Sequence, residues 1–291
     1  MNQAKENNPK RSRLSTPLSV GATQVGRQRW GAERRGQGLE ERLLLAALEA
    51  GRDILDIYED PAQDFGIERK ADNSPLTLAD KAAHRRIMQW LEPTGIPVLS
   101  EEGQHLPYTE RLHWDTLWIV DPLDGTKEFI KKNGEFTVNI ALVREGQPLL
   151  GVVYVPVLGD LYFTVPSPSG EGWGEGPLFA RKVHVPCQRP FPSVEAIVAK
   201  SQPLPISREE DGEDGIVASR SHSTPETEAF VEQRRREHAR VRLVSSGSSI
   251  KICLVAEGRA DAYPRYAPTM EWDTAAGHAV VACAGKWGYQ A

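Results

Sequence analysis

The order of apolar and polar residues predicts two amphipathic helices at the start of the ordered part of the chain. The first helix begins near Leu39, and a Glu-Asp-Pro segment that closes on Pro61 ends it. Its apolar face consists of residues spaced alternately four and three apart, which are Leu44, Leu48, Gly51, Leu55 and Tyr58. The second helix begins after Thr77, which forms a T-x-x-D capping pattern with Asp80, and it ends at Pro93.

Short apolar runs after the second helix predict strands. They cover residues 97–99, 117–120, 136–143 and 150–155. The third run alternates apolar and polar residues, and a Glu-Gly-Gln-Pro segment after it turns the chain into the fourth. We therefore expect a hairpin-rich, largely antiparallel sheet backed by the two helices.

Strand and helix patterns alternate in the second half of the chain. Strands are predicted at 215–219, 241–244 and 260–263, and helices at 225–239, 248–257 and 273–284. This order predicts a parallel or mixed sheet between helices, and hence an α/β protein with an α+β N-terminal part, two sheets and three helical layers. The chain divides into a tail at 1–38, an N-terminal half at 39–190 and a C-terminal half at 191–291.

Charge and composition narrow the class of protein. Residues 1–38 contain eight Lys and Arg against two Glu, a net charge of +6, so the remainder carries −11 of the overall −5. The composition of this basic tail predicts disorder, and a membrane-surface or targeting role stays open beside that of a solvated extension. The acidic body argues against a nucleic-acid polymer as the partner. Without a membrane-spanning apolar run or a secretory signal, we expect a cytoplasmic protein, with peripheral association at the inner membrane face as an alternative.

The segment 121–126 (DPLDGT) carries two carboxylates directly after an apolar strand. Its proline fixes one backbone angle, and Gly125 permits a conformation that other residues resist. Asp121, Asp124 and the carbonyl of Leu123 can therefore face one point. Hard oxygen ligands of this kind suit Mg²⁺. The alternative is an Asp-Pro turn followed by a helix cap.

Further acidic positions could join this site. Glu101 and Glu102 follow one strand as the DPLDGT segment follows the next, which would bring both sets of acids to one edge; the alternative is a solvated acidic turn. Asp273 and Asp80 each stand at a helix start, where the carboxylate could cap the helix or face a metal ion or water. Small residues within 246–251 precede another helix and form a candidate anion cradle.

Three segments in this order resemble the inositol monophosphatase superfamily of Mg²⁺-dependent, lithium-sensitive phosphatases. They are residues 99–102 (LSEE), 121–129 (DPLDGTKEF) and 272–277 (WDTAAG), and the resemblance extends from about Leu39 to Trp287. Residues 125–130 (GTKEFI), 133–140 (NGEFTVNI) and 247–258 are similar to the bacterial 3'(2'),5'-bisphosphate nucleotidase branch. Inositol phosphatases more typically have Thr-Asn-Phe where this chain has Lys-Glu-Phe.

The resemblance implies a five-layer αβαβα sandwich that releases the 3'-phosphate of adenosine 3',5'-bisphosphate to give AMP, with the 3'-phosphorylated sulfate donor as a second substrate. It implies two or three Mg²⁺ ions per site and inhibition by Li⁺. The implied metal ligands are Glu101, Asp121, the Leu123 carbonyl, Asp124 and Asp273. Asp80 and Thr126, together with Glu101, would activate the water, and the substrate would be bound by Gly125, Thr126, Ser248, Lys251 and Asp273.

One departure from the family leaves alternative functions open. Members normally continue past the last predicted helix into another strand, whereas this sequence stops soon after it, which implies a truncated C-terminal half. The alternatives are therefore an inositol or sugar monophosphatase, which would differ in its pocket, and a truncated non-catalytic paralogue. The sequence does not indicate an oligomeric state.

Overall fold

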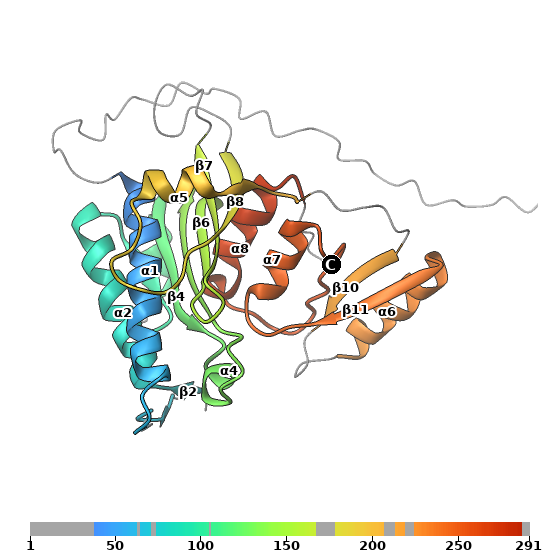
Figure 1. Ribbon diagram of the computed structural model, residues 1–291, viewed down its shortest axis with the longest axis horizontal. Helices are drawn as coiled ribbons and strands as arrows, with labels where there is room; N and C mark the ends of the chain where they lie inside the picture. The colour runs from blue at the N-terminus through green and yellow to red at the C-terminus, as the bar shows by residue number, and fades with distance from the viewer. Residues whose placement is uncertain are drawn as a thin grey trace, which may run out of the picture. The chain divides into compact units, whose positions relative to one another are not determined.

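The computed structural model describes residues 38–62, 65–70, 74–104, 106–166, 178–206, 213–218 and 224–286 (Figure 1). The predicted basic tail, apart from Gly38, lies outside these ranges, as do the end of the chain from Trp287 and the strand end expected at Ser219. In the parts that are described, no helix has the length and apolar character that a membrane crossing requires.

The two predicted N-terminal helices are confirmed as α1 (Leu39–Tyr58) and α2 (Leu78–Leu91). A capping box begins α2, because the Thr77 hydroxyl accepts the backbone N–H of Asp80 and an Asp80 carboxylate oxygen accepts the Thr77 N–H at 2.7 Å. The predicted apolar face of α1 is buried. Both helices cover one face of the large sheet, where they contact β4, β5 and β6.

The large sheet contains seven strands in the order β3-β4-β5-β6-β7-β8-β9, and every neighbouring pair is antiparallel except β3 and β4. Its strands are β3 (Val98–Ser100), β4 (Thr116–Asp124), β5 (Thr137–Arg144), β6 (Gln147–Val155), β7 (Asp160–Pro166), β8 (Leu178–His184) and β9 (Gln202–Pro203). The first four confirm the predicted runs. The last three were not predicted from the sequence.

The second face of this sheet is covered by α7 (Ile250–Glu257) and α8 (Glu271–Cys283). Two hydrophobic clusters of buried residues, one containing α1 and α2 and the other α7 and α8, occupy the two sides of the sheet. A second sheet of two parallel strands, β10 (Glu213–Ala218) and β11 (Arg240–Ser245), contacts α7, and α6 (Pro225–Glu237) packs on it. The expected alternation of helical and sheet layers is present.

Several local predictions differ from the structure. In place of the strand expected at 260–263, the structure has a single bridge between Ala262 and Ile216. The helix expected from Ser248 begins at Ile250. Elements that were not predicted are β1 (Glu68–Arg69), β2 (Pro75–Leu76), η1 (Glu92–Thr94), α3 (Tyr108–Arg111), α4 (Thr126–Ile130) and α5 (Val194–Lys200).

Helix α8 lies directly on β6 at Gly151, and this contact gives a stability prediction. A Cβ atom on Gly151 would stand 2.6 Å from the backbone oxygen of Ala276 and 2.7 Å from the Cβ of Ala279. We expect Gly151→Ala to lower the free energy of unfolding by about 1–3 kcal/mol, the usual cost of overpacking, as measured by denaturant titration. The matched control is Gly215→Ala, whose new Cβ meets no atom nearer than 3.2 Å. An equal loss in the two variants would contradict the prediction.

Candidate metal centre

The parallel pair β3 and β4 brings two acidic positions to one edge of the sheet. Ser100 pairs with Val120, so the next residues, Glu101 just after β3 and Asp121 within β4, lie side by side. The Glu101 N–H donates to the Val120 carbonyl at 3.1 Å and continues this register by one residue. The expectation that neighbouring strands deliver both acids to one edge is thus confirmed.

The turn after Asp121 directs a second carboxylate toward the same point. The register with β5 shifts between Asp121 and Asp124, and the Leu123 N–H donates to an Asp121 carboxylate oxygen at 3.1 Å. Gly125 has a φ of 97°, in the left-handed region that favours glycine, and α4 begins at Thr126. This geometry agrees with the reason that the sequence suggested for the glycine.

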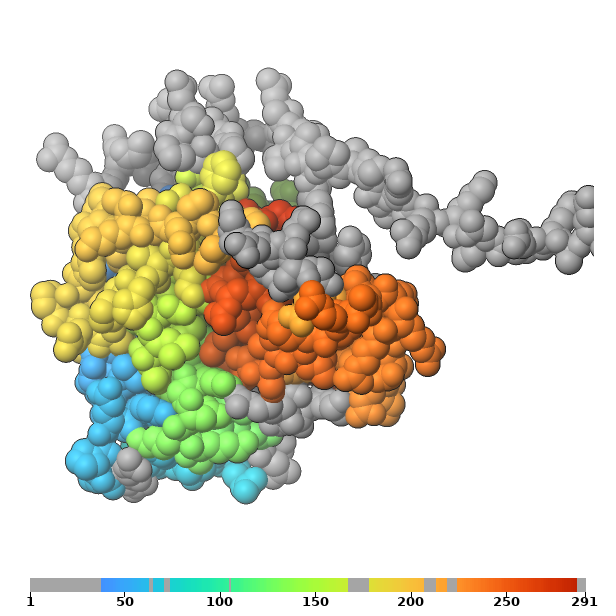
Figure 2. Space-filling model, turned by 45° about the vertical axis from the view of Figure 1, so that its right-hand side comes forward, coloured from blue at the N-terminus to red at the C-terminus, as the bar shows by residue number. Residues whose placement is uncertain are grey.

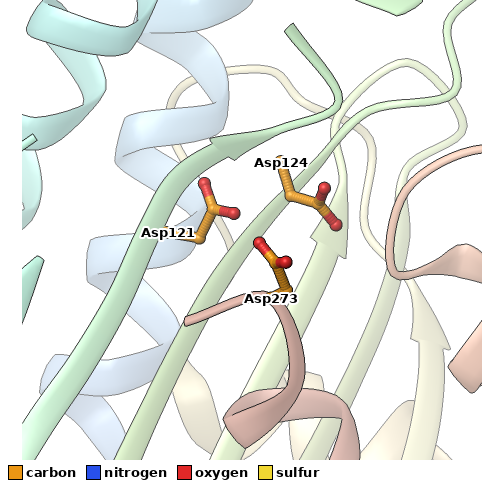
Figure 3. A group of neighbouring side chains, drawn as sticks. All are labelled: Asp121, Asp124 and Asp273. Carbon is orange, nitrogen blue, oxygen red and sulfur yellow. The ribbon is translucent and has the colours of Figure 1, made fainter. Parts of the chain in front are cut away.

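The third carboxylate comes from α8, more than a hundred residues further along the chain. Asp273 is the third residue of the helix and caps it, because its Oδ2 accepts the Met270 N–H at 3.1 Å and the Thr269 hydroxyl at 2.6 Å. Asp121, Asp124 and Asp273 each present a carboxylate oxygen within 4.8 Å of the other two (Figure 3). The sequence left a cap and a metal site as alternatives for Asp273, and the geometry is compatible with both.

Glu101 lies next to this group but is engaged by a cation of the protein. Lys70 Nζ donates to Glu101 Oε1 at 2.7 Å and also bonds to Glu102. Burial opposes the charged lysine, but the two glutamates raise its pKa above the ordinary value. The sequence placed Glu101 among the metal ligands, whereas the group brought together within 4.8 Å contains the three aspartates.

The electrostatics of the three aspartates favour a bound cation. Burial, followed by the charges of Glu101, Asp124 and Asp273, raises the pKa of Asp121 well above its ordinary range. Burial also raises the pKa of Glu101, although Lys70 opposes the shift. Closely spaced carboxylates are costly unless a cation neutralises them, and an all-oxygen donor set suits a hard divalent ion such as Mg²⁺. The residues present therefore fit the metal that the sequence predicted.

Asp80 and Thr126 lie together beside the cluster, as the sequence predicted. The Thr126 hydroxyl donates to Asp80 Oδ1 at 3.2 Å, while Asp80 Oδ2 caps α2. The same hydroxyl is 3.4 Å from the Leu123 carbonyl oxygen. Burial raises the pKa of Asp80, so this carboxylate is a stronger proton acceptor than a solvated one.

A cavity of about 460 Å³ opens beside the aspartates, lined by residues of both halves. Figure 2 shows the green surface of the N-terminal half next to the orange and red surface of the C-terminal half. Asp124, Gly125 and Thr126 line it, together with the cations Lys251 and Arg265. The cavity is thus polar, with both signs of charge on its wall.

Two predicted substrate residues have partners inside the protein. Lys251 is buried and its Nζ donates to the Ser248 carbonyl at 2.7 Å, while the Ser248 hydroxyl donates to Asp124 Oδ2 at the same distance. Arg265 was not predicted, and it contacts Asp273 at 3.2 Å. No local pattern marks Arg265, because its position depends on the loop between α7 and α8.

The crowded carboxylates predict how the stability of the metal-free protein varies with pH. A carboxyl group whose pKa is raised by folding stabilises the fold fully only below its unfolded-state pKa, about 4. This contribution is lost as the pH rises through the folded-state pKa. We expect Tm in EDTA to fall as the pH rises above about 4, and Mg²⁺ to raise Tm most at alkaline pH, because binding requires deprotonated ligands.

The control for this effect is Asp121→Asn, which removes the most buried charge and keeps an oxygen that can accept the Leu123 N–H. In EDTA at pH 8 this variant should melt at a higher temperature than the wild type, with a flatter pH profile. Parallel profiles for the two proteins would show that Asp121 is not the source of the pH dependence.

Comparison with known proteins agrees with the geometry. Residues 39–287 match the model of the inositol monophosphatase family. The chain is 46% identical over 241 residues to 3'(2'),5'-bisphosphate nucleotidase CysQ of Escherichia coli O157:H7, which covers 82% of this chain and 85% of the relative. It is 44% identical over 247 residues to the protein of the same name from Salmonella typhimurium, covering 84% and 87%.

Solved structures show the same relationship. The crystal structure of CysQ from Bacteroides thetaiotaomicron, a bacterial member of the inositol monophosphatase family, aligns with a TM-score of 0.73 and 53% identity, covering 84% of this chain and 85% of the other. The extragenic suppressor protein suhB from Bartonella henselae, at 24% identity and a TM-score of 0.63, covers 86% of each chain and shares the fold. The chain therefore belongs to the inositol monophosphatase family, as its sequence motifs predicted.

Proposed function

We propose that the protein is a Mg²⁺-dependent 3'(2'),5'-bisphosphate nucleotidase that releases the 3'-phosphate of adenosine 3',5'-bisphosphate to give AMP. The observation that carries the proposal is the convergence of Asp121, Asp124 and Asp273 beside a cavity that Lys251 and Arg265 also line. A cation site adjoining fixed positive charges suits a substrate with two phosphates. The relatives of 44–46% identity that bear the CysQ name support this choice over an inositol phosphatase. The 3'-phosphorylated sulfate donor is a second proposed substrate.

Each predicted site residue has a proposed role. Asp121, Asp124, Asp273 and the Leu123 carbonyl would hold Mg²⁺, with Glu101 joining them when Lys70 releases it. The bound ion would lower the pKa of a coordinated water and neutralise phosphoryl oxygens. The family depends on metal, and we propose two or three ions per site and inhibition by Li⁺.

The proton and phosphate contacts follow from the side chains beside the cluster. Because the Thr126 hydroxyl donates its proton to Asp80, its oxygen has a lone pair directed to accept a proton from the attacking water. The raised pKa of Asp80 would let that carboxylate receive the proton in turn. The backbone amides of Gly125 and Thr126 would bind the departing phosphate, and Ser248 and Lys251 the rest of the nucleotide.

Both halves of the chain would contribute residues to the site. The N-terminal half, 39–190, supplies most of the proposed ligands, and the C-terminal half, 191–291, supplies Asp273 and the cations of the cavity. A small phosphorylated nucleotide is the proposed partner, and a cytoplasmic location and peripheral membrane association stay predictions. The opposing hypothesis is that the protein is a non-catalytic paralogue.

The test is phosphate release from adenosine 3',5'-bisphosphate, inositol monophosphate and fructose 1,6-bisphosphate, each with Mg²⁺ and with EDTA. We expect Mg²⁺-dependent release that is fastest from the nucleotide. Release only from inositol monophosphate or fructose 1,6-bisphosphate would contradict the proposed substrate and leave the proposed metal chemistry unchanged. No release from any substrate, by protein that binds Mg²⁺, would favour the non-catalytic paralogue.

A further inference from the structure

Four polar side chains outside the proposed ligand set converge on one oxygen of Asp124. Ser248 and Ser249 each bring a hydroxyl to 2.7 Å from Asp124 Oδ2. Asn139 Nδ2 lies 3.4 Å and Thr137 Oγ1 3.5 Å from the same oxygen. One carboxylate oxygen is thus occupied by the protein.

The distances favour one arrangement of the donors along the deepest branch of this network. A carboxylate only accepts, and Asp124 Oδ2 is the nearest acceptor of Ser249, so Ser249 donates its proton to Asp124. The Ser249 oxygen can then accept, and it lies 2.9 Å from Asn139 Nδ2. With its amide nitrogen directed to Ser249, Asn139 presents its oxygen to the Thr137 hydroxyl at 2.9 Å. Protons are therefore donated from Thr137 to Asn139, from Asn139 to Ser249 and from Ser249 to Asp124.

This chain of donors is buried and joins the two halves of the protein. Thr137, Asn139 and Ser249 are 0%, 1% and 3% exposed, so water cannot replace the bonds that they make. Thr137 and Asn139 belong to β5, whereas Ser249 precedes α7. The Ser249 hydroxyl is also 3.2 Å from the backbone carbonyl of Asp273, so it touches the residue that supplies the C-terminal carboxylate.

We infer that Ser249, oriented by Asn139, is a positioning residue for the metal centre. By occupying Asp124 Oδ2, Ser249 fixes the rotation of that carboxylate beside Asp121 and Asp273. The inference rests on the proposed function, because it takes the three aspartates as metal ligands.

The test measures Mg²⁺ binding to the free protein by calorimetry, without substrate. Ser249→Ala should raise the Kd for Mg²⁺ about 10- to 100-fold, the usual effect of removing a partner of a metal ligand. Asn139→Ala should raise it less, and it should add little in the Ser249→Ala background, since the shorter bond of Asn139 is to Ser249 and its direct contact with Asp124 is long. A merely structural role would not give this non-additive pattern in Kd.

The matched control is Ser201→Ala, which removes a buried serine hydroxyl that bonds Val198 and Arg181, remote from the aspartates. It should lower Tm without changing the Kd for Mg²⁺. A Ser249→Ala Kd within about twofold of the wild type would overturn the inference and leave the proposed function intact. Wild-type protein that binds no Mg²⁺ would overturn both. If Ser249→Ala does not fold, the Kd of Asn139→Ala decides, and an unchanged value overturns the inference.

Discussion

Asp124→Asn is expected to lower kcat at least about a thousandfold, which corresponds to ~4 kcal/mol of lost transition-state stabilisation, while the fold is retained. The amide has the volume of the carboxylate, and its oxygen can accept the hydroxyls of Ser248 and Ser249. In that orientation the NH₂ group takes the place of Asp124 Oδ1, and a nitrogen bearing two protons cannot bind a cation. Turnover should therefore fall because the metal is lost.

The measurement is kcat for phosphate release at saturating Mg²⁺, with the circular dichroism spectrum as the check on folding. Asp115→Asn is the control, because it makes the same substitution on the exposed residue just before β4. This control should keep wild-type turnover. Near wild-type activity in Asp124→Asn would remove Asp124 from the site.

The protein should prefer adenosine 3',5'-bisphosphate to inositol monophosphate by at least about a hundredfold in kcat/KM, or ~2.7 kcal/mol. Inositol monophosphate lacks the base and the second phosphate, so the binding energy of the groups that contact them cannot be used in the transition state. One or two charge-assisted contacts are sufficient for this difference. Equal values for both substrates would contradict the nucleotidase assignment and leave the metal-phosphatase chemistry standing.

A substitution at Lys251 tests which group causes the preference for the bisphosphate. It is buried on the wall of the cavity, and its ammonium lies 5.5 Å from the centre of the Tyr263 ring. Lys251→Met keeps most of the side-chain volume and removes the charge. We expect it to lower kcat/KM for the bisphosphate and to change that for inositol monophosphate little, and a uniform loss on both substrates would assign Lys251 a structural role instead.

Local signals in the sequence predicted most of the helices and the central strands. Periodicity and the capping residues Thr77 and Asp80 fixed α1 and α2, because these signals involve contacts three or four residues apart. Strand β7 could not be recognised from such a local signal. Leu161, Tyr162 and Phe163 are all buried, so apolar and polar residues do not alternate along this strand.

The arrangement of the candidate site was also predictable from the sequence only in part. The DPLDGT turn and the strand ends predicted the approach of Glu101 and Asp121, since residues that follow parallel neighbours share an edge. The bonds from Ser249 and Asn139 to Asp124, and the contact of Arg265 with Asp273, could not be predicted. Ser249 and Asn139 are separated by 110 residues, and no local pattern records such a contact.

The wide separation of the three aspartates along the chain has a consequence for chain entropy. Asp121 and Asp273 are 152 residues apart, and bringing the ends of a flexible segment of that length together costs about (3/2)RT ln 152, or ~4 kcal/mol. In the folded protein, the contacts of α8 with the sheet offset this cost. An unfolded chain would have to close the same loop to gather the three carboxylates, so it should hold divalent ions only weakly.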